Sequence, residues 1–190
     1  MPFDIVHSDL WTSPVLSFGG HRYYVLFLDD FTYFLWTFSI SNKPQVYSIF
    51  SQFRAHIQTQ FECLIKCFQC DKGKEYDNNL FQKSCEQNGM SFRFYCPHTS
   101  PQNGKAERKI RTINNIICTL LAHASIPPIF WHHALQMATY LHNMIPNKKL
   151  NLQSPTKILY QKDPAYSHLR VFSCLCYPLI PSTTRNKLQP

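Results

Sequence analysis

Three acidic residues stand where their carboxylates can act together. Asp9 ends the apolar run of residues 3–9, and Asp71 ends a second apolar run, residues 64–71. Glu107 lies just inside a helical pattern that opens at residue 100. Two carboxylates at strand ends and a third on a later helix can hold two divalent metal ions for phosphoryl transfer on nucleic acid.

Other acids in the chain have simpler explanations. Asp29 and Asp30 end a strand pattern before a hairpin, where turn chemistry favours aspartate. Glu75 and Asp77 follow Asp71 closely and are expected to be solvated acids. Any single aspartate at a strand end is most often an ordinary turn residue. The metal-site hypothesis therefore depends on the joint placement of the three acids.

The strands that must position these acids follow from hydrophobic periodicity. Apolar and alternating runs predict five strands, at residues 3–10, 21–29, 34–40, 64–70 and 91–95. The fourth strand follows a helix pattern, so it can pair parallel to the first. Such pairing would bring Asp9 and Asp71 to the same edge of one sheet.

The helices are predicted from apolar residues at helical spacing. They fall at residues 43–60, 78–88, 130–144 and 156–160, with a long helix after a predicted loop at 96–104. The inward stripe of the long helix is Ala106, Ile110, Ile113, Ile117 and Leu121. Glu107 follows Ala106 directly and so lies off the centre of this stripe. A last strand is expected at residues 170–177.

This order of elements predicts a mixed α/β domain with a five-stranded sheet. A chain of 190 residues suits one domain with a sizeable core and an appendage. We predict the core at residues 1–145 and a basic, proline-punctuated C-terminal extension at residues 146–190.

The charge balance favours a polyanionic partner. The chain has 19 lysines and arginines against 11 acids, a net charge of +8. Charge alone does not separate nucleic acid from an anionic membrane. No basic amphipathic helix, no secretory signal and no apolar run of membrane-spanning length is found, so nucleic acid is the favoured partner.

The eight cysteines do not predict a disulfide framework or a zinc site. A domain of this size with a full core needs no disulfides, so most cysteines are interpreted as small buried hydrophobic residues. Cys67 and Cys70 form a Cys-x-x-Cys pair inside a strand pattern. No second pair follows at a spacing typical of zinc ligands.

Basic and amide side chains gather near the start of the long helix. Lysine and arginine at a helix N-terminus are unfavourable for the helix dipole, which suggests phosphate binding as their use. The candidate nucleic-acid-binding residues are Lys72, His98, Gln102, Asn103, Lys105, Arg108, Lys109 and Arg111. The alternative is that these charges only solvate the helix, and DNA would then follow the basic residues Lys148, Lys149 and Arg170.

Five segments in order resemble the integrase catalytic core of copia-type LTR retrotransposons, part of a retrovirus-related Pol polyprotein. The segments are residues 7–11, 20–30, 71–76, 98–109 and 167–172. The resemblance implies a ribonuclease-H-like fold, a five-stranded mixed sheet flanked by helices. It also implies that Asp9, Asp71 and Glu107 are the catalytic Asp-Asp-Glu triad and the ligands of two Mg²⁺ or Mn²⁺ ions.

The resemblance further implies a function in DNA integration. The expected enzyme is a polynucleotidyl transferase and endonuclease that processes element ends and joins them to target DNA. Its partners would be double-stranded DNA and, within the full integrase, further copies of itself, with no membrane. Its site of action would be the nucleus, although no targeting segment is identified.

Two departures from the family pattern leave an alternative open. Lys72, Gly73 and Lys74 replace the usual Asn-Gly-Gly after the second aspartate. The N-terminal zinc domain and the other Pol domains are expected to be absent, so the chain resembles a piece of a polyprotein. The alternative is an inactive relic domain that only binds nucleic acid. A plain ribonuclease H is a weaker interpretation, because it lacks the segment Gln102-Asn103-Gly104.

Overall fold

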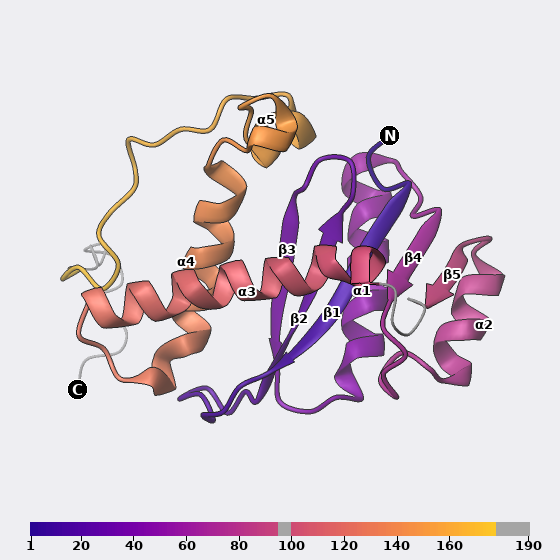
Figure 1. The fold of residues 1–190 in the computed structure, drawn as a ribbon, viewed down its shortest axis with the longest axis horizontal. Helices are drawn as coiled ribbons and strands as arrows, with labels where there is room; N and C mark the ends of the chain where they lie inside the picture. The colour runs from indigo at the N-terminus through magenta and orange to yellow at the C-terminus, as the bar shows by residue number, and fades with distance from the viewer. Residues whose placement is uncertain (95–99, 178–190) are drawn as a thin grey trace, which may run out of the picture.

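The computed structural model describes residues 1–94 and 100–177, with the side chains of residues 100–103 excepted. A five-stranded mixed sheet forms its centre, as predicted (Figure 1). In the order in which they lie side by side, the strands are β3 (Leu35–Ile40), β2 (Tyr23–Asp29), β1 (Ile5–Thr12), β4 (Cys67–Cys70) and β5 (Ser91–Phe94).

Two kinds of connection build the sheet. β1, β2 and β3 are joined without intervening helices and pair antiparallel. β4 and β5 each follow a helix, α1 (Gln45–Phe61) and α2 (Asn79–Gln87), and each pairs parallel to its neighbour. A parallel strand requires such a crossover connection, so the predicted parallel pairing of the first and fourth strands is confirmed.

Helices cover both faces of the sheet. Figure 1 shows α3 (Ser100–His123) crossing in front of the sheet and α1 behind it. Strand β2 is buried on both faces: Val25 and Phe27 belong to the core on the α1 side, and Tyr24, Leu26 and Leu28 to the core on the α3 side. This alternation follows from the two-residue period of a strand.

The long helix α3 begins earlier than predicted. The prediction of a loop at residues 96–104 is wrong from Ser100 onward, because Pro101 falls in the first turn, where proline is tolerated. The predicted inward stripe is confirmed, since all five of its residues, from Ala106 to Leu121, are buried. α4 (Trp131–Met144) packs against α3 and follows a short 3₁₀ turn, Pro128–Phe130.

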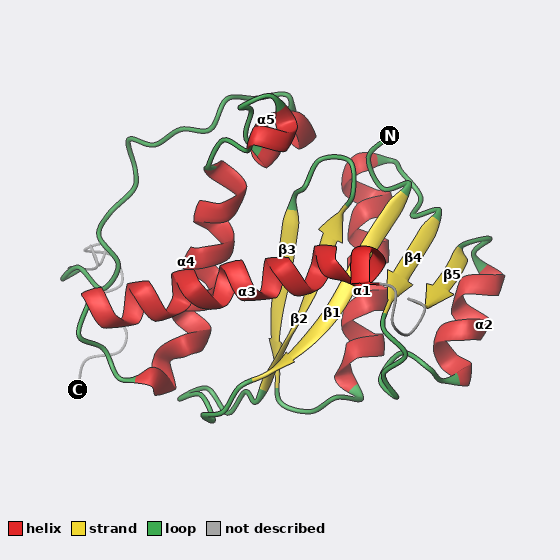
Figure 2. Cartoon of the chain, in the orientation of Figure 1, coloured by secondary structure: helices red, strands yellow, loops and turns green. Residues whose placement is uncertain are grey.

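The part after α4 remains attached to the core. A 3₁₀ turn, Lys148–Leu150, leads to α5 (Pro155–Tyr160), which lies beyond the end of α4 (Figure 2). The Thr156 hydroxyl donates to the carbonyl of Asn143 in α4 at 2.8 Å. The strand predicted at residues 170–177 is not formed. Val171 and Leu175 are 71% and 78% exposed, whereas Phe172 packs against the core on the α3 side. The segment is therefore held by packing against helices and not by pairing with an edge of the sheet. Among the described residues, no helix has the length and apolarity to cross a membrane.

Candidate active site

Asp9 and Asp71 lie at the same level on neighbouring parallel strands. β1 and β4 pair from Ile5 opposite Cys67 to His7 opposite Gln69, and continuing this register places Asp71 opposite Asp9. Asp9 does not end its strand as predicted, because β1 continues along β2 to Thr12. The pairing of β1 with β4 ends two residues earlier, at His7 and Gln69, so both aspartates lie just past the paired part of these two strands.

Both aspartates face α3. Asp9 pairs with Leu26 of β2, and Leu26 belongs to the core that α3 covers. Gln69 of β4 pairs with His7 and lies on the same face as Asp9, and continuing the strand alternation one residue past the end of β4 assigns Asp71 to this face. Glu107 lies on α3, next to the buried Ala106, and is itself exposed. The fold thus directs all three candidate ligands to one side of the sheet.

Asp9 is held in an environment that disfavours its charge. Burial raises its pKa to about 7, although the backbone N–H of Leu10 donates to its Oδ1 at 2.8 Å and opposes the shift. The negative charges of Asp71, Glu107 and Glu75 raise the pKa further. These carboxylates therefore lie close enough to Asp9 to act on it electrostatically.

Asp71 follows β4 directly and accepts a hydrogen bond from the Gly73 N–H at 3.2 Å. Burial raises its pKa, the charge of Glu75 raises it further, and the charge of Lys43 lowers it. Within the described part of the chain, no three histidine, cysteine or acidic side chains are grouped closely enough to hold a metal ion. The two aspartates are thus brought to one level of the sheet, and Glu107 contributes its charge from the exposed surface of α3.

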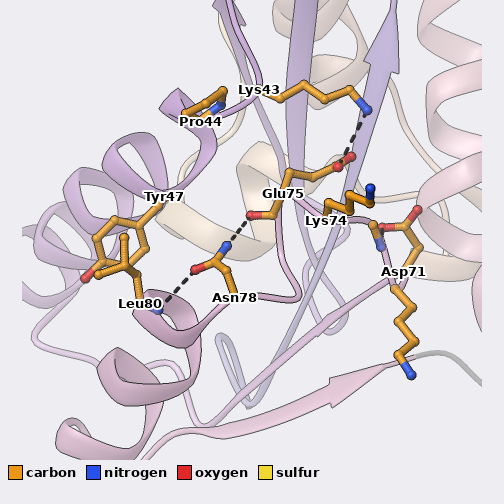
Figure 3. A pocket seen from close by; sticks show the side chains of 10 residues that line it. Lys43, Pro44, Tyr47, Asp71, Lys74, Glu75, Asn78 and Leu80 are labelled. Carbon is orange, nitrogen blue, oxygen red and sulfur yellow. Dashed lines mark hydrogen bonds and ion pairs between the residues drawn. The ribbon is translucent and has the colours of Figure 1, made fainter.

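A cavity of about 680 Å³ lies beside Asp71, between the β4–α2 loop and the start of α1. Figure 3 shows Lys43 and Glu75 facing one another across it, with Nζ and Oε2 3.6 Å apart. Asn78 shapes the loop, because its amide donates to the Glu75 carbonyl and its side-chain oxygen caps α2. Lys72 and Lys74 are exposed and also line the cavity.

The prediction that Glu75 is a solvated acid is wrong. Its side chain is only 8% exposed and is paired with Lys43. No feature of the sequence connects these two residues, because Lys43 precedes α1 and Glu75 follows β4. Asp77, in contrast, is exposed, which agrees with its prediction as a solvated acid.

Asp29 and Asp30 serve the β2–β3 turn, as predicted, but with more partners than a turn requires. Asp29 is fully buried and accepts hydrogen bonds from the Phe3 N–H at 2.7 Å and from the Thr32 N–H and hydroxyl. Asp30 lies 2.9 Å from His7 Nε2 and 2.5 Å from Lys105 Nζ. The His7 contact, ahead of the Lys105 contact, lowers the Asp30 pKa to about 2.

The predicted basic residues on α3 have different environments. Lys105 is paired with Asp30, whereas Arg108 and Arg111 are exposed. Lys109 Nζ lies 3.0 Å from His142 Nε2, and burial lowers the Lys109 pKa to about 8, with a further contribution from the charge of Lys149. Four lysines and arginines are therefore not equivalent, and two of them have partners inside the fold.

The remaining predicted positions are less informative. His98 lies outside the described residues, and Gln102 and Asn103 lie on the first turn of α3 with their side chains outside the description. The interpretation of most cysteines as buried is wrong for the described residues: Cys67, Cys70 and Cys85 are buried, Cys63 is half-buried, and Cys118, Cys174 and Cys176 are exposed.

Sequence comparisons show the family of the chain. The sequence model of the Integrase core domain matches residues 1–100. The chain is 38% identical over 188 residues to the Retrovirus-related Pol polyprotein from transposon RE2 of Arabidopsis thaliana, covering 99% of this chain and 13% of that protein. It is 34% identical to the Pol polyprotein from transposon TNT 1-94 of Nicotiana tabacum, covering 97% of this chain and 14% of that protein. The chain therefore spans about an eighth of the length of these relatives.

Solved structures share the fold. The integrase catalytic core domain of HTLV-2 in complex with magnesium, in a trimeric form, aligns with a TM-score of 0.62 at 16% identity, covering 84% of this chain and 97% of that one. A chain from the structure of the simian T-cell lymphotropic virus intasome in complex with PP2A regulatory subunit B56 gamma aligns with a TM-score of 0.68 at 14% identity. The alignment covers 96% of this chain and 61% of that one. These neighbours establish the ribonuclease-H-like fold. The chain belongs to the integrase core domain family, and the predicted resemblance to copia-type retrotransposon integrases is confirmed.

Proposed function

We propose that this chain is the catalytic core of a retrotransposon integrase, which processes the ends of element DNA and joins them to target DNA. The observation that carries the proposal is the pairing of β1 with β4, which places Asp9 and Asp71 at one level on the face that α3 covers. Glu107 on α3 adds its charge to the same site. Oligomerisation and action in the nucleus belong to this proposal as requirements of joining two DNA ends to a chromosome.

The donor set suits hard divalent cations. Asp9, Asp71 and Glu107 offer only carboxylate oxygens, the ligands that Mg²⁺ and Mn²⁺ prefer. Burial first, and then repulsion from Asp71 and Glu107, raises the Asp9 pKa, and a bound cation would relieve that repulsion. Two such ions, when bound, would polarise the phosphodiester and activate the attacking hydroxyl.

The other residues of the site orient DNA and set the local field. The charge of Lys43 lowers the pKa of Asp71. The ion pair with Glu75 neutralises part of this positive charge near the aspartates. Lys72 and Lys74 are exposed at the cavity rim and are placed to contact phosphates. We therefore assign these lysines to DNA binding rather than to competition with metal.

A disintegration assay with Mg²⁺ or Mn²⁺ tests the proposal, because this reverse reaction asks least of other domains. We expect strand transfer by the wild-type chain and at least a roughly 10³-fold loss in Asp71→Asn, since the charge that holds the cation is removed. Asp77→Asn, an exposed acid of the same loop, is the matched control and should retain activity.

Two outcomes would overturn the proposal. Equal activity in Asp71→Asn and Asp77→Asn would place the chemistry elsewhere. DNA binding by the wild-type chain without strand transfer under either metal would favour the relic domain that only binds nucleic acid.

A further inference from the structure

A second cavity, of about 240 Å³, lies between α3, the β2–β3 turn and the segment after α4. We call it the basic pocket and define it by its four cationic side chains, Lys105, Arg108, Lys109 and Lys149, together with Tyr33 and Asn147, which also line it. A water molecule occupies roughly 30 Å³ in the liquid. The basic pocket therefore has room for a phosphate group together with several waters.

We propose that the basic pocket binds a phosphate group of the DNA backbone at a point separate from the three carboxylates. The inference rests on the proposed function in that it takes DNA as the substrate. It extends that function by joining Tyr33, which was not among the predicted DNA-binding residues, and Lys149, which was predicted only as part of the alternative DNA path, to the cations of α3 in one phosphate site.

Charge in the basic pocket is strongly unbalanced. Of its four cationic side chains, only Lys105 has an acidic partner among the described residues, Asp30. Lys109 Nζ instead lies 3.0 Å from Nε2 of His142, and burial lowers the pKa of this histidine to about 4, so it adds no negative charge. Lys149 and Arg108 are exposed at the rim. An anion in the cavity would offset the repulsion among these charges, which are desolvated in part by the walls.

Tyr33 holds two of the cations in place. Lys109 Nζ and Lys149 Nζ each lie 5.5 Å from the centre of its ring, at cation–π distance. The backbone of Tyr33 is left-handed, with φ 57°, and this strained conformation is unusual for a bulky residue. Two ammonium groups fixed by one ring form a preorganised site for an anionic oxygen, because their positions need no further ordering on binding.

The position of the pocket favours a DNA phosphate over a free anion. Lys105 lines both the basic pocket and a third cavity, of about 490 Å³, which His7, Asp30, Gln69 and Arg93 also line. His7 and Gln69 precede Asp9 and Asp71 by two residues on the same face of the sheet. A strand bound at the carboxylates can therefore continue past Lys105 into the basic pocket along α3.

The test measures binding of a short DNA duplex by fluorescence anisotropy, in EDTA, over a range of salt concentrations. Each phosphate contact contributes about −0.9 to the slope of log affinity against log salt. We expect Lys149→Gln to make the slope shallower by about one and to weaken binding about five- to tenfold at 0.1 M salt. Lys149→Arg should retain the wild-type slope. Lys162→Gln, which removes an exposed lysine beyond α5, is the matched control and should change little.

The inference is overturned if Lys149→Gln and Lys162→Gln have the same slope. A parallel NMR titration with inorganic phosphate identifies the other source of the ligand: if phosphate shifts the signals of Tyr33 and Lys149 while the DNA slope of Lys149→Gln is unchanged, the pocket holds a small anion and not DNA. Because no metal is present, these results are independent of catalysis. Failure of the disintegration assay would leave the binding result intact, and the reverse also holds.

Discussion

Burial raises the pKa of Asp29 at the β2–β3 turn and of the half-buried Asp9 and Asp71, but the hydrogen bonds made to these carboxylates differ. Asp29, at the β2–β3 turn, is fully buried, and its carboxylate accepts hydrogen bonds from the Phe3 N–H, the Thr32 N–H and the Thr32 hydroxyl. Within residues 1–94 and 104–177, Asp9 and Asp71 each accept one hydrogen bond, from a backbone N–H one or two residues away, and lie among other negative charges. An acid whose oxygens are satisfied by the protein serves the fold, and acids left in mutual repulsion are available to a cation.

The largest effect is expected at Asp9. Its pKa is raised to about 7, so the folded protein binds a proton that the unfolded chain releases near pH 4, and stability falls as pH rises between these values. Asp9→Asn removes this penalty. We expect unfolding free energy at pH 8 to rise by about 2 to 4 kcal/mol, with little change at pH 4, while strand transfer is lost. Urea unfolding at both pH values measures the difference; a loss of stability at pH 8 would contradict the assignment.

Asp29→Asn should have the opposite pattern. The amide nitrogen replaces an oxygen that accepts from Phe3 or from Thr32, so one buried donor loses its partner. We expect unfolding free energy to fall by about 1 to 3 kcal/mol, with strand transfer per folded molecule retained. Asp77→Asn controls for loss of an exposed charge. If Asp29→Asn abolished activity without loss of stability, the separation between structural and ligand-binding acids would be wrong.

The sequence predicts the elements of the fold best where hydrophobic residues recur with the period of a strand or a helix. The apolar run at residues 21–29 predicted a strand, and the helical stripe from Ala106 to Leu121 predicted which face of the long helix is buried, because that period follows from backbone geometry alone. The parallel pairing of β1 and β4 was predictable because a helix lies between strands that share an edge.

The partners of individual charges were not predictable. Glu75 pairs with Lys43, and Lys109 shares a tyrosine ring with Lys149, across segments that only the tertiary fold brings together. The start of α3 was placed too late because Pro101 and Gly104 indicate a loop when their position in a helix is unknown. The strand predicted at residues 170–177 failed because apolar residues there pack on helices or remain exposed.

The smallest effect on the unfolding free energy is expected at Asp30, a partly exposed acid that is paired with His7 and Lys105. Its pKa is lowered to about 2 by His7 and Lys105, so its contribution to stability is present above about pH 4 and is lost as pH falls toward 2. The carboxylate is 29% exposed, so screening limits the effect of Asp30→Asn to about 1 kcal/mol at pH 7. The wild-type chain should therefore be more stable than Asp30→Asn at pH 7, and the difference in unfolding free energy should disappear as the pH falls toward 2. The same difference at pH 2 and at pH 7 would contradict the pairing.

The most direct test of the carboxylate site is a titration with Mn²⁺ followed by electron paramagnetic resonance of the free ion. If Asp9, Asp71 and Glu107 form the metal site, the wild-type chain should bind Mn²⁺ at pH 8, and binding should weaken as pH falls below about 7, because Asp9 then takes up a proton. Asp71→Asn should lose at least one bound ion, and Asp77→Asn should match the wild-type chain. Equal binding by all three proteins, or binding that does not change with pH, would contradict the assignment of these carboxylates to metal.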